Sequence, residues 1–310
     1  MKAVQYRKFG PPEVLEWTEA REPRPRPDQA LVRVAAASLN PKDVLVRKGR
    51  FRWLSGRRFP RGCGYDFAGT VVASGLPPGV GDEVFGMLNG WAGGSHAELV
   101  AVPVDELALR PAFLPLEDCA ALPLVGLTAL QALRDLGCLG PGGAVLVNGA
   151  SGGVGTVSVQ IARALGARVT GVCSARNHEL VASLGAAEVV DYAATDLRSL
   201  RGPFDVVFDV FGNRSFAELG DLLTPDGAYV TTVPSPTAAG QHALSYLRPG
   251  RKAWMVAVRS NAADLRTLAQ MADEGLLRPV IDRRYALAES AEAHRYLETR
   301  RARGKVLLVP

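Results

Sequence analysis

A glycine-rich turn follows a short apolar run near the middle of the 310-residue chain. Gly149, Gly152 and Gly155 recur at three-residue spacing directly after Val145–Val147. Apolar residues then recur at helical spacing as far as Leu165. A buried strand that ends in glycines and opens a helix presents unpaired backbone N–H groups and the positive end of the helix dipole, where a pyrophosphate can bind. The spacing and its context therefore predict a dinucleotide site.

The residues after the next expected strand indicate which dinucleotide is bound. NAD sites of this kind place an acidic residue about 20 positions beyond the glycines, where it binds the adenosine ribose. Here that stretch holds Ser174 and Arg176, and the first acid is Glu179. A hydroxyl and a guanidinium suit the 2′-phosphate of NADP, through charge-assisted bonds worth about 1.5–3 kcal/mol each. We therefore expect NADPH as the cofactor.

Strands and helices alternate around and after the glycine turn. This alternation predicts a doubly wound parallel sheet. Beyond the strand at Val145–Val147, we expect strands at 168–173, 188–190, 206–210, 228–233 and 253–258, with helices at 177–184 and 215–223.

The chain before the glycine turn has a different pattern. Short strands joined by Pro/Gly turns predict an antiparallel, barrel-like β domain over about the first 115 residues. A helical segment at 116–136 leads into the glycine turn, and we assign the chain after residue 258 to the β domain as well. The strands are expected at 3–6, 14–17, 30–37, 67–73, 83–86 and 97–102, and the last segment holds helices at 262–274 and 289–300 and a strand at 305–309.

Composition excludes several classes of protein. A hydrophobic fraction of 47% and a mean hydropathy of +0.07 are typical of a globular chain rather than a disordered or membrane one. No apolar run approaches the ~20 residues of a membrane span, and the N-terminus has no signal-peptide core. Scattered cysteines without a CxxC pair indicate reduced thiols, so we expect a cytoplasmic protein. The cysteines are Cys63, Cys119, Cys138 and Cys173.

The net charge of +5 is unevenly distributed. Seven basic residues and no acid lie between Arg47 and Arg61. This basic stretch is either a solvated loop or an electropositive rim that steers a polyanionic cofactor or an acidic substrate. We do not expect nucleic acid as a partner, because the chain has no recognisable nucleic-acid module.

Eight motifs spread over the chain match one superfamily in order. They are SLNPKD (38–43), GYDFAGTV (64–71), GDEVFG (81–86), AALPLVGLTALQAL (120–133), NGASGGVG (148–155), LGAAEVVDY (184–192), FDVVFDVFG (204–212) and RGKVLL (303–308). The chain resembles the zinc-independent quinone oxidoreductase branch of the medium-chain dehydrogenase/reductase superfamily. SLNPKD and VCSARN resemble most the homologues of the plastid envelope and the reticulon-interacting reductases, whose suggested substrates are quinones and α,β-unsaturated carbonyls.

The resemblance implies an α/β fold of two domains that meet at a cleft. A GroES-like β-barrel substrate domain would hold residues 1–121 and 259–310, and an NADPH-binding Rossmann domain, a doubly wound parallel sheet, would hold residues 122–258. By motif position, the residues that contact NADPH would be Thr128, Ser151, Gly152, Gly153, Val154, Ser174, Arg176 and Tyr192. The nicotinamide half would be bordered by Phe211, Val233 and Val256. The residues that reach the cleft would be Arg300 and Lys305.

The zinc-dependent relatives have ligands that this chain lacks. They carry a cysteine where this chain has Asn40, and a His-Glu pair where it has Tyr65 and Asp66. No cysteine lies at 122–128, where the third ligand would be, and the four histidines show no ligand spacing. A catalytic zinc needs three Cys, His or acidic ligands. We therefore expect no metal.

Without a Lewis acid, hydride addition to a conjugated carbonyl is easier than reduction of a simple ketone, because the charge spreads into an enolate. We expect Asn40, Tyr65 or Lys42 to stabilise that charge or to supply the proton, with water as an alternative acid, and Asp43 to orient its neighbours from the start of a helix. Simpler quinone oxidoreductases carry tyrosines where Leu45 and Phe51 align. The more apolar pocket favours alkenals or other hydrophobic enones.

The expected function is transfer of hydride from NADPH to a quinone or an α,β-unsaturated carbonyl without zinc. One alternative is a 2-enoyl-thioester reductase whose basic stretch binds a coenzyme A or phosphopantetheine group. Another is a non-catalytic nucleotide- or RNA-binding homologue. We also expect a homodimer, because the apolar strand at 253–258 would be a sheet edge that needs covering.

Overall fold

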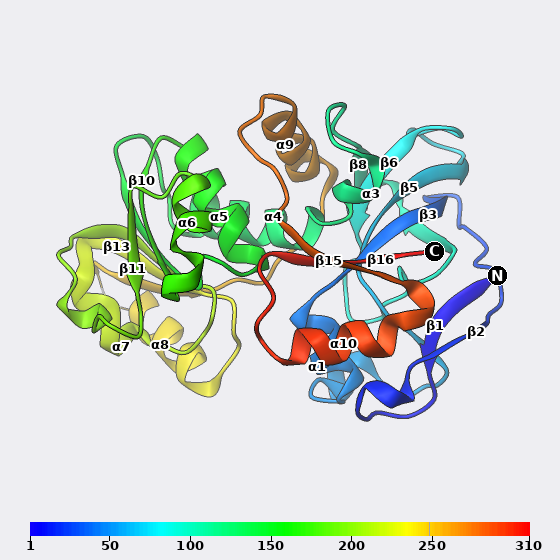
Figure 1. Cartoon of the computed structure of the whole chain (residues 1–310), viewed down its shortest axis with the longest axis horizontal. Helices are drawn as coiled ribbons and strands as arrows, with labels where there is room; N and C mark the ends of the chain where they lie inside the picture. Colours follow the sequence, from blue (N-terminus) through cyan, green and yellow to red (C-terminus); the bar gives the residue numbers. More distant parts are fainter. Residues whose placement is uncertain (248) are drawn as a thin grey trace. The chain divides into compact units, whose positions relative to one another are not determined.

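The computed structural model describes residues 1–247 and 249–310, which form two compact units (Figure 1). Residues 1–127 and 259–310 make up the terminal unit, and residues 128–258 make up the central unit. The division falls within helix α4 (Pro123–Leu130), a few residues after the boundary that the sequence suggested.

A parallel sheet forms the core of the central unit. Its strand order, β11-β10-β9-β12-β13-β14, is that of a doubly wound dinucleotide-binding fold, so the predicted fold class is confirmed. Every neighbouring pair in this order is parallel. The strands are β9 (Ala144–Asn148), β10 (Arg168–Cys173), β11 (Glu188–Asp191), β12 (Phe204–Asp209), β13 (Leu223–Thr231) and β14 (Lys252–Met255).

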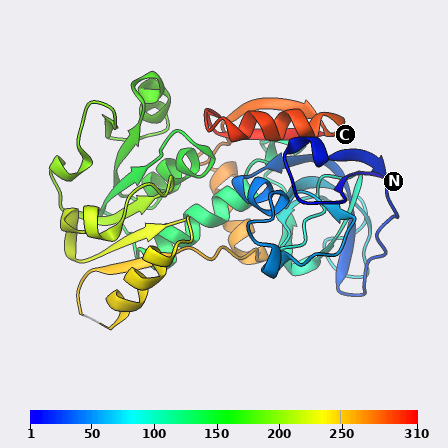
Figure 2. The ribbon, with the colours of Figure 1, turned by 90° about the horizontal axis from the view of Figure 1, so that it is seen from below.

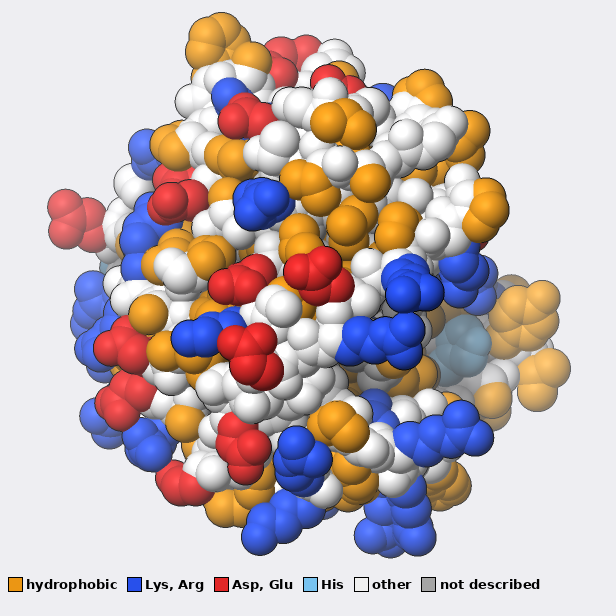
Figure 3. Space-filling model, turned by 90° about the vertical axis from the view of Figure 1, so that its right-hand side faces the viewer, with side chains coloured by type: hydrophobic (Ala, Val, Ile, Leu, Met, Phe, Trp, Pro, Cys, Tyr) orange, Lys and Arg blue, Asp and Glu red, His pale blue; other side chains and the backbone are white. Residues whose placement is uncertain are grey.

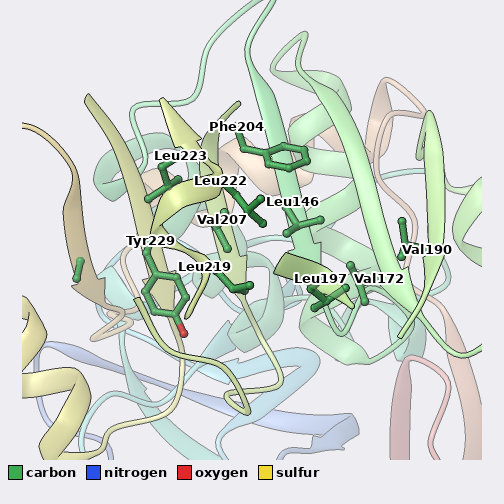
Figure 4. Packing of buried hydrophobic residues seen from close by; sticks show 11 residues of the cluster. Leu146, Val172, Val190, Leu197, Phe204, Val207, Leu219, Leu222, Leu223 and Tyr229 are labelled. Carbon is green, nitrogen blue, oxygen red and sulfur yellow. The ribbon is translucent and has the colours of Figure 1, made fainter. Parts of the chain in front are cut away.

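Helices cover this sheet, which explains why Val145–Val147 is apolar throughout: all three side chains are fully buried. One hydrophobic cluster draws side chains from each of the six strands, including Leu146 of β9 and Tyr229 of β13 (Figure 4). The surrounding helices are α5 (Gly153–Ala164), α6 (His178–Ser183), α7 (Phe216–Leu219) and α8 (Pro236–Tyr246), and a π-helical turn at Gln131–Leu136 follows α4.

Two parts of the central unit differ from the prediction. The expected helix at 215–223 ends early, because α7 gives way to a 3₁₀ turn and β13 begins at Leu223. The segment Thr224–Gly227 has the composition of a turn, so the sequence did not indicate that the strand begins before it. The pairing of β13 with β12 is irregular there, with a register shift between Phe204 and Val206. Helix α8 was not predicted, although Ser235 caps it by accepting from the Ala238 N–H.

Antiparallel strands dominate the terminal unit. The larger sheet has the order β15-β16-β3-β5-β6-β8, with β7 also paired to β3, and the smaller has the order β2-β1-β4. The sequence did not indicate β4, β8 and β15. The strands are β1 (Lys2–Tyr6), β2 (Glu16–Glu19), β3 (Gln29–Leu39), β4 (Arg61–Gly62), β5 (Asp66–Ala73), β6 (Glu83–Met87), β7 (Leu99–Pro103), β8 (Leu107–Leu109), β15 (Ile281–Ala286) and β16 (Lys305–Val309).

The end of the chain is built into this unit. Strand β16 pairs antiparallel with β3, and helix α10 (Ser290–Glu298) packs against α1 (Pro41–Arg47) and the 3₁₀ turn at Pro12–Val14. Figure 2 shows α10 beside the N-terminal segment. The remaining helices are α2 (Arg52–Ser55), α3 (Leu116–Cys119) and α9 (Ala262–Asp273). Among the described residues, no helix has the length and apolar character that crossing a bilayer requires.

Candidate active site

The glycine turn joins β9 to α5 with almost no room for side chains. Gly149 has a φ of +89°, a region that favours glycine. A Cβ atom on Gly155 would lie 2.1 Å from the Gly149 carbonyl oxygen, so this glycine allows helix and turn to pack. A Cβ atom on Gly152 would have no atom closer than 3.6 Å. The space at Gly152 therefore remains for a ligand at the N-terminus of α5.

A buried carboxylate holds the loop that follows β12. Asp209 Oδ1 accepts from Asn148 Nδ2 at 2.8 Å and from the Gly212 N–H at 2.9 Å. Its Oδ2 accepts from the Tyr229 hydroxyl at 2.9 Å and from the Arg214 N–H at 3.1 Å. These bonds tie the carboxyl ends of β9 and β12 to the loop. The sequence analysis missed this role of Asp209, because the strand FDVVFD reads as ordinary core.

Three apolar residues expected near the nicotinamide lie at that edge of the sheet. A Cβ atom on Gly149 would lie 3.2 Å from Phe211, and one on Gly212 would lie 2.2 Å from Val233, so both side chains border the glycine turn and its neighbouring loop. Phe211 and Val233 are exposed by 50% and 40%. Val256 is half-buried, and its N–H donates to the Thr231 carbonyl.

One amide connects the glycine turn to the segment after β10. Asn177 Nδ2 donates to Ser151 Oγ at 3.0 Å and to Ser174 Oγ at 3.2 Å. Each hydroxyl oxygen accepts this bond, so each hydroxyl proton is free to donate elsewhere. Arg176 is exposed in the same 3₁₀ turn, Ala175–Asn177. The sequence predicted Ser174 and Arg176 but not Asn177, because its contact with Ser151 joins positions 26 residues apart.

The other predicted cofactor residues of the central unit differ in accessibility. Tyr192 is 56% exposed directly after β11, whereas Thr128 is buried in α4. Gly153 and Val154 form the first turn of α5, where backbone N–H groups lack helical partners.

A buried polar cluster occupies the terminal unit where β3, β5 and β16 meet. Asp66 Oδ2 accepts from Ser38 Oγ at 2.7 Å, from Asn40 Nδ2 at 2.9 Å and from Lys305 Nζ at 3.3 Å, while Oδ1 accepts from the Leu124 N–H at 2.9 Å. Lys305 is 3% exposed and Asp66 fully buried. Burial lowers the pKa of Lys305, and the Asp66 carboxylate opposes this shift. We call these five residues the Asp66 cluster.

The cluster corrects two expectations. Lys305 was expected to reach the cofactor, but its ammonium donates to Asp66, to Asn40 Oδ1 at 2.5 Å and to the Leu39 carbonyl at 3.3 Å. Asn40 was expected to donate to the substrate, but its amide N–H groups face Asp66 and the Ser38 carbonyl, and the residue is 1% exposed. Both residues therefore stabilise the interior. Arg300, the other residue expected at the cleft, is exposed after α10 with a φ of +57°.

Asp43 has the positioning role that the sequence suggested. Its Oδ2 accepts from the Asn40 N–H at 2.7 Å at the start of α1. Burial raises the pKa of Asp43 to about 7, and the Asn40 N–H opposes that rise.

Lys42 lies on an aromatic surface next to this cluster. Its ammonium stands 3.7 Å from the Tyr65 ring centroid and 5.2 Å from the Trp91 ring centroid, and it donates to the Gly90 carbonyl at 2.7 Å. Burial lowers the pKa of Lys42, and the carboxylates of Asp43 and Asp66 oppose this. Tyr65 is buried and donates to the Trp91 carbonyl at 3.1 Å, and burial raises its pKa. Of the four candidates, Lys42 therefore keeps the most accessible protons.

The basic stretch does not form one continuous surface. Arg47 is fully buried and binds Glu298 and the Gly10 carbonyl. Arg61 turns inward and donates to the Tyr6 hydroxyl at 3.2 Å. Among the charged side chains, only Lys and Arg appear at the lower right of the face drawn in Figure 3, whereas both signs of charge mix elsewhere on that face. The arginines of the stretch that stay exposed are Arg50, Arg52, Arg57 and Arg58.

Comparisons with known proteins agree with this architecture. The family model of the alcohol dehydrogenase GroES-like domain matches residues 26–112, and that of the zinc-binding dehydrogenases matches residues 184–308. A solved structure, the quinone oxidoreductase from Coxiella burnetii, superposes with a TM-score of 0.91 at 33% identity, covering 100% of this chain and 99% of that chain.

Curated relatives match over nearly the whole chain. The chloroplast envelope quinone oxidoreductase homologue of Arabidopsis thaliana is 33% identical over 100% of this chain and 98% of its own length. The human mitochondrial NAD(P)H oxidoreductase RTN4IP1 is 32% identical over 97% of this chain and 87% of its own length. The 2-methylene-furan-3-one reductase of Solanum lycopersicum is 33% identical over 100% of this chain and 79% of its own length.

Zinc, which one family description implies, does not fit the residues at the expected ligand positions. Asn40 offers an amide that is already hydrogen-bonded, and Tyr65 offers a phenol whose pKa burial raises. Asp66 is the remaining carboxylate, and the Lys305 ammonium already balances its charge. A catalytic zinc site requires three Cys, His or acidic ligands.

Replacing Gly155 or Gly152 with alanine is expected to affect stability and NADPH binding differently. Gly155→Ala places the methyl group against the Gly149 carbonyl and is expected to lower the free energy of unfolding by about 1–3 kcal/mol or more. Gly152→Ala has room for the methyl group and is expected to change stability by less than about 0.5 kcal/mol. It should still weaken NADPH binding by roughly tenfold, because the methyl group occupies the approach to the backbone. Urea unfolding and a fluorescence titration with NADPH measure both; wild-type affinity in Gly152→Ala would contradict a phosphate site there.

The Asp66 cluster predicts strong coupling between two charges. Lys305→Met leaves a buried carboxylate unbalanced and is expected to cost about 3–5 kcal/mol in urea unfolding. The double variant Lys305→Met with Asp66→Asn removes both charges and should recover most of that loss. An equal loss in the single and double variants would show that the ion pair does not determine stability here.

Proposed function

The chain belongs to the quinone oxidoreductase homologues of the medium-chain dehydrogenase/reductase superfamily, and we propose that it transfers hydride from NADPH to a quinone or an α,β-unsaturated carbonyl without zinc. The family makes it an NAD(P)H-dependent oxidoreductase. The observation that supports NADPH and a retained activity is the arrangement of Asn177 with Ser151 and Ser174 beside the exposed Arg176.

This arrangement suits a phosphate more than a ribose hydroxyl. Asn177 fixes the two serine oxygens as acceptors, so both hydroxyl protons are available to an anion. Arg176 adds a guanidinium that can form a charge-assisted bond to a phosphate oxygen. No acidic residue occupies positions 174–178, where a carboxylate would bind the ribose and repel a 2′-phosphate. The glycine turn offers the pyrophosphate its N–H groups.

The terminal unit supplies the acid chemistry in this proposal. Bound NADPH supplies the hydride, which enters the β carbon of a conjugated carbonyl and leaves negative charge on an enolate. The Lys42 ammonium stabilises this charge and donates a proton to the enolate, because it is half-buried and, among the described residues, it donates one hydrogen bond, to the Gly90 carbonyl. Asn40 and Asp43 position the segment around α1.

Apolar side chains near Lys42 favour hydrophobic acceptors. The rings of Phe51 and Trp91 pack at a tilt of 40° with centroids 4.7 Å apart, and Leu45 is 38% exposed on α1. The tomato relative is named as a reductase of 2-methylene-furan-3-one, a conjugated enone. These features support alkenals and other enones over small hydrophilic quinones.

A 2-enoyl-thioester reductase is the second candidate. The exposed arginines Arg50, Arg52, Arg57 and Arg58 have no ion-pair partner among the described residues and would suit the phosphates of coenzyme A. A non-catalytic nucleotide-binding protein requires no proton donor and leaves the position of Lys42 unexplained.

We extend the proposal to a homodimer through β14, the edge strand of the parallel sheet. The edge is already covered at Ala253, whose N–H donates to Ser245 Oγ and whose carbonyl accepts from His242 Nδ1. A partner strand would therefore pair along Trp254 and Met255. The cytoplasmic location stays a prediction, because the relatives named above include chloroplast-envelope and mitochondrial proteins.

Arg176→Glu tests the choice of cofactor. The reversed charge is expected to weaken NADPH binding by about a hundredfold and NADH binding by less than threefold, because only NADPH carries the 2′-phosphate. Calorimetric titrations of both coenzymes measure the two affinities. Arg201→Glu is the matched control, since Arg201 is also exposed in the central unit. Equal losses for NADPH and NADH would overturn the assignment.

A substrate panel combined with Lys42→Met tests the reaction. NADPH oxidation is measured with 1,4-benzoquinone, 2-alkenals and a 2-enoyl-coenzyme A, and the highest kcat/KM is expected for the alkenals. Lys42→Met should lower kcat by about 10²-fold or more and leave the Kd for NADPH unchanged.

Lys8→Met, which removes an exposed lysine of the same unit, is the control. Full activity of Lys42→Met towards alkenals would exclude this lysine as the acid. Absence of turnover with all three substrate classes, despite tight NADPH binding, would favour the non-catalytic alternative.

A further inference from the structure

Three side chains that can ligate a metal meet inside the terminal unit, and none of them is a residue proposed for catalysis. Cys63 follows β4, His96 precedes β7 and His294 lies in α10. All three are buried, and one ligand atom from each lies within 4.8 Å of the others. These residues show no ligand spacing in the sequence, because 231 positions separate Cys63 from His294.

The distances suit a metal ion. Cys63 Sγ lies 3.6 Å from His294 Nε2. A single ion bound at about 2.3 Å from sulfur and 2.0 Å from nitrogen separates these atoms by about 3.5–3.7 Å at trigonal or tetrahedral angles. The third ligand, His96, lies within 4.8 Å of the other two ligand atoms. It therefore has to move towards them by about 1 Å at most to complete the set.

The two ring nitrogens of His96 have the hydrogen-bonding pattern of a metal-binding histidine. Its Nε2 faces the Ser38 carbonyl at 3.4 Å, so Nε2 carries the proton and Nδ1 keeps its lone pair. His96 Nδ1 is buried without a partner among the described residues. A ring nitrogen held by a backbone carbonyl, with the other nitrogen free, is the usual arrangement of metal-binding histidines. Gly64 allows this ring position, since a Cβ atom there would lie 2.1 Å from His96 Cδ2.

We propose that Cys63, His96 and His294 form a buried Cys-His₂ site for one Cu⁺ ion. The site holds three ligands in a fully buried place, whereas zinc with three protein ligands keeps an open position for water. Thiolate and imidazole ligands suit Cu⁺. Binding replaces the thiol proton of Cys63 with the ion and releases that proton to solvent, so the buried charge does not change.

The charged groups around the site support a monovalent ion. The guanidinium of Arg47 acts on His294 and Cys63, and the carboxyl of Asp43 acts on Cys63. A divalent ion with one thiolate would add a net positive charge beside the buried Arg47, whose own charge Glu298 already balances.

The site would be structural. It joins the segment after β4, the segment before β7 and helix α10, three parts of the terminal unit that meet only after folding. It is independent of the proposed hydride transfer, because none of its ligands belongs to the glycine turn, the Asp66 cluster or the Lys42 surface.

Metal analysis of refolded protein tests the proposal. The full chain is unfolded in urea and refolded anaerobically with Cu⁺, with Zn²⁺ or without metal, so that burial of the site cannot block entry. We expect one copper per chain after removal of weakly bound ion, and a thermal midpoint about 4–8 °C above that of the metal-free protein. X-ray absorption at the copper edge should show one sulfur and two nitrogen neighbours.

Cys63→Ser keeps the size of the side chain and removes the thiolate, so its copper content should fall below about a tenth of an equivalent. Cys119→Ser, a buried cysteine of α3 in the same unit, should retain full copper. NADPH binding, measured separately, should be unchanged in both variants. The proposal would be overturned if the wild-type protein refolds with Cu⁺ to its native structure but holds no copper. It would also be overturned if Cys63→Ser holds as much copper as the wild-type protein. Stoichiometric zinc in preference to copper would overturn the charge argument and the choice of ion.

Discussion

A buried ion pair between Asp66 and Lys305 joins the two sequence segments of the terminal unit. A single charge buried in a protein interior costs several kcal/mol unless a partner and hydrogen bonds compensate it. Here the partner comes from β16, 239 positions after Asp66, and further donors come from Ser38, Asn40 and the backbone of Leu124. The end of the chain must therefore join the N-terminal sheet for the carboxylate to be satisfied, which couples the two sequence segments of this unit.

The central unit uses the same physical rule to prepare a binding surface. Asp209 has both carboxylate oxygens satisfied by two side chains and two backbone N–H groups, and this fixes the loop that carries Phe211. Asn177 uses one amide nitrogen to orient two serine hydroxyls. In both places, the hydrogen bonds of a buried side chain determine which neighbouring groups remain free. The free groups, Arg176 and the hydroxyl protons, all suit an anion.

Patterns that depend on neighbours in sequence were sufficient for much of this structure. The glycine turn and the doubly wound parallel sheet follow from spacing that is visible in the sequence. The missed features depend on distant residues or on polar side chains within apolar strands: Asn177, the role of Asp209, the start of β13 and the meeting of Cys63 with His294. The burial of Arg47 within the basic stretch was not visible in the sequence for a related reason, because its partner is Glu298, 251 positions away.

The choice between Asn40 and Lys42 as the proton donor depends on which of their N–H groups are already hydrogen-bonded, and it bears on the substrate class. Asn40 has its amide engaged inside the Asp66 cluster, whereas the Lys42 ammonium lies over two aromatic rings, which attract a cation without consuming its N–H groups. One ammonium in a half-buried place stabilises a developing oxyanion less than a metal ion does. It is therefore suited to acceptors whose negative charge is already delocalised. Conjugated carbonyls and quinones meet this condition because hydride addition produces an enolate or a hydroquinone anion, whereas an isolated ketone concentrates the charge on one oxygen. The proposed preference for conjugated substrates thus follows from the same feature as the poor fit to zinc: Asn40 and Tyr65 supply no metal ligand, and an ammonium takes the place of a Lewis acid.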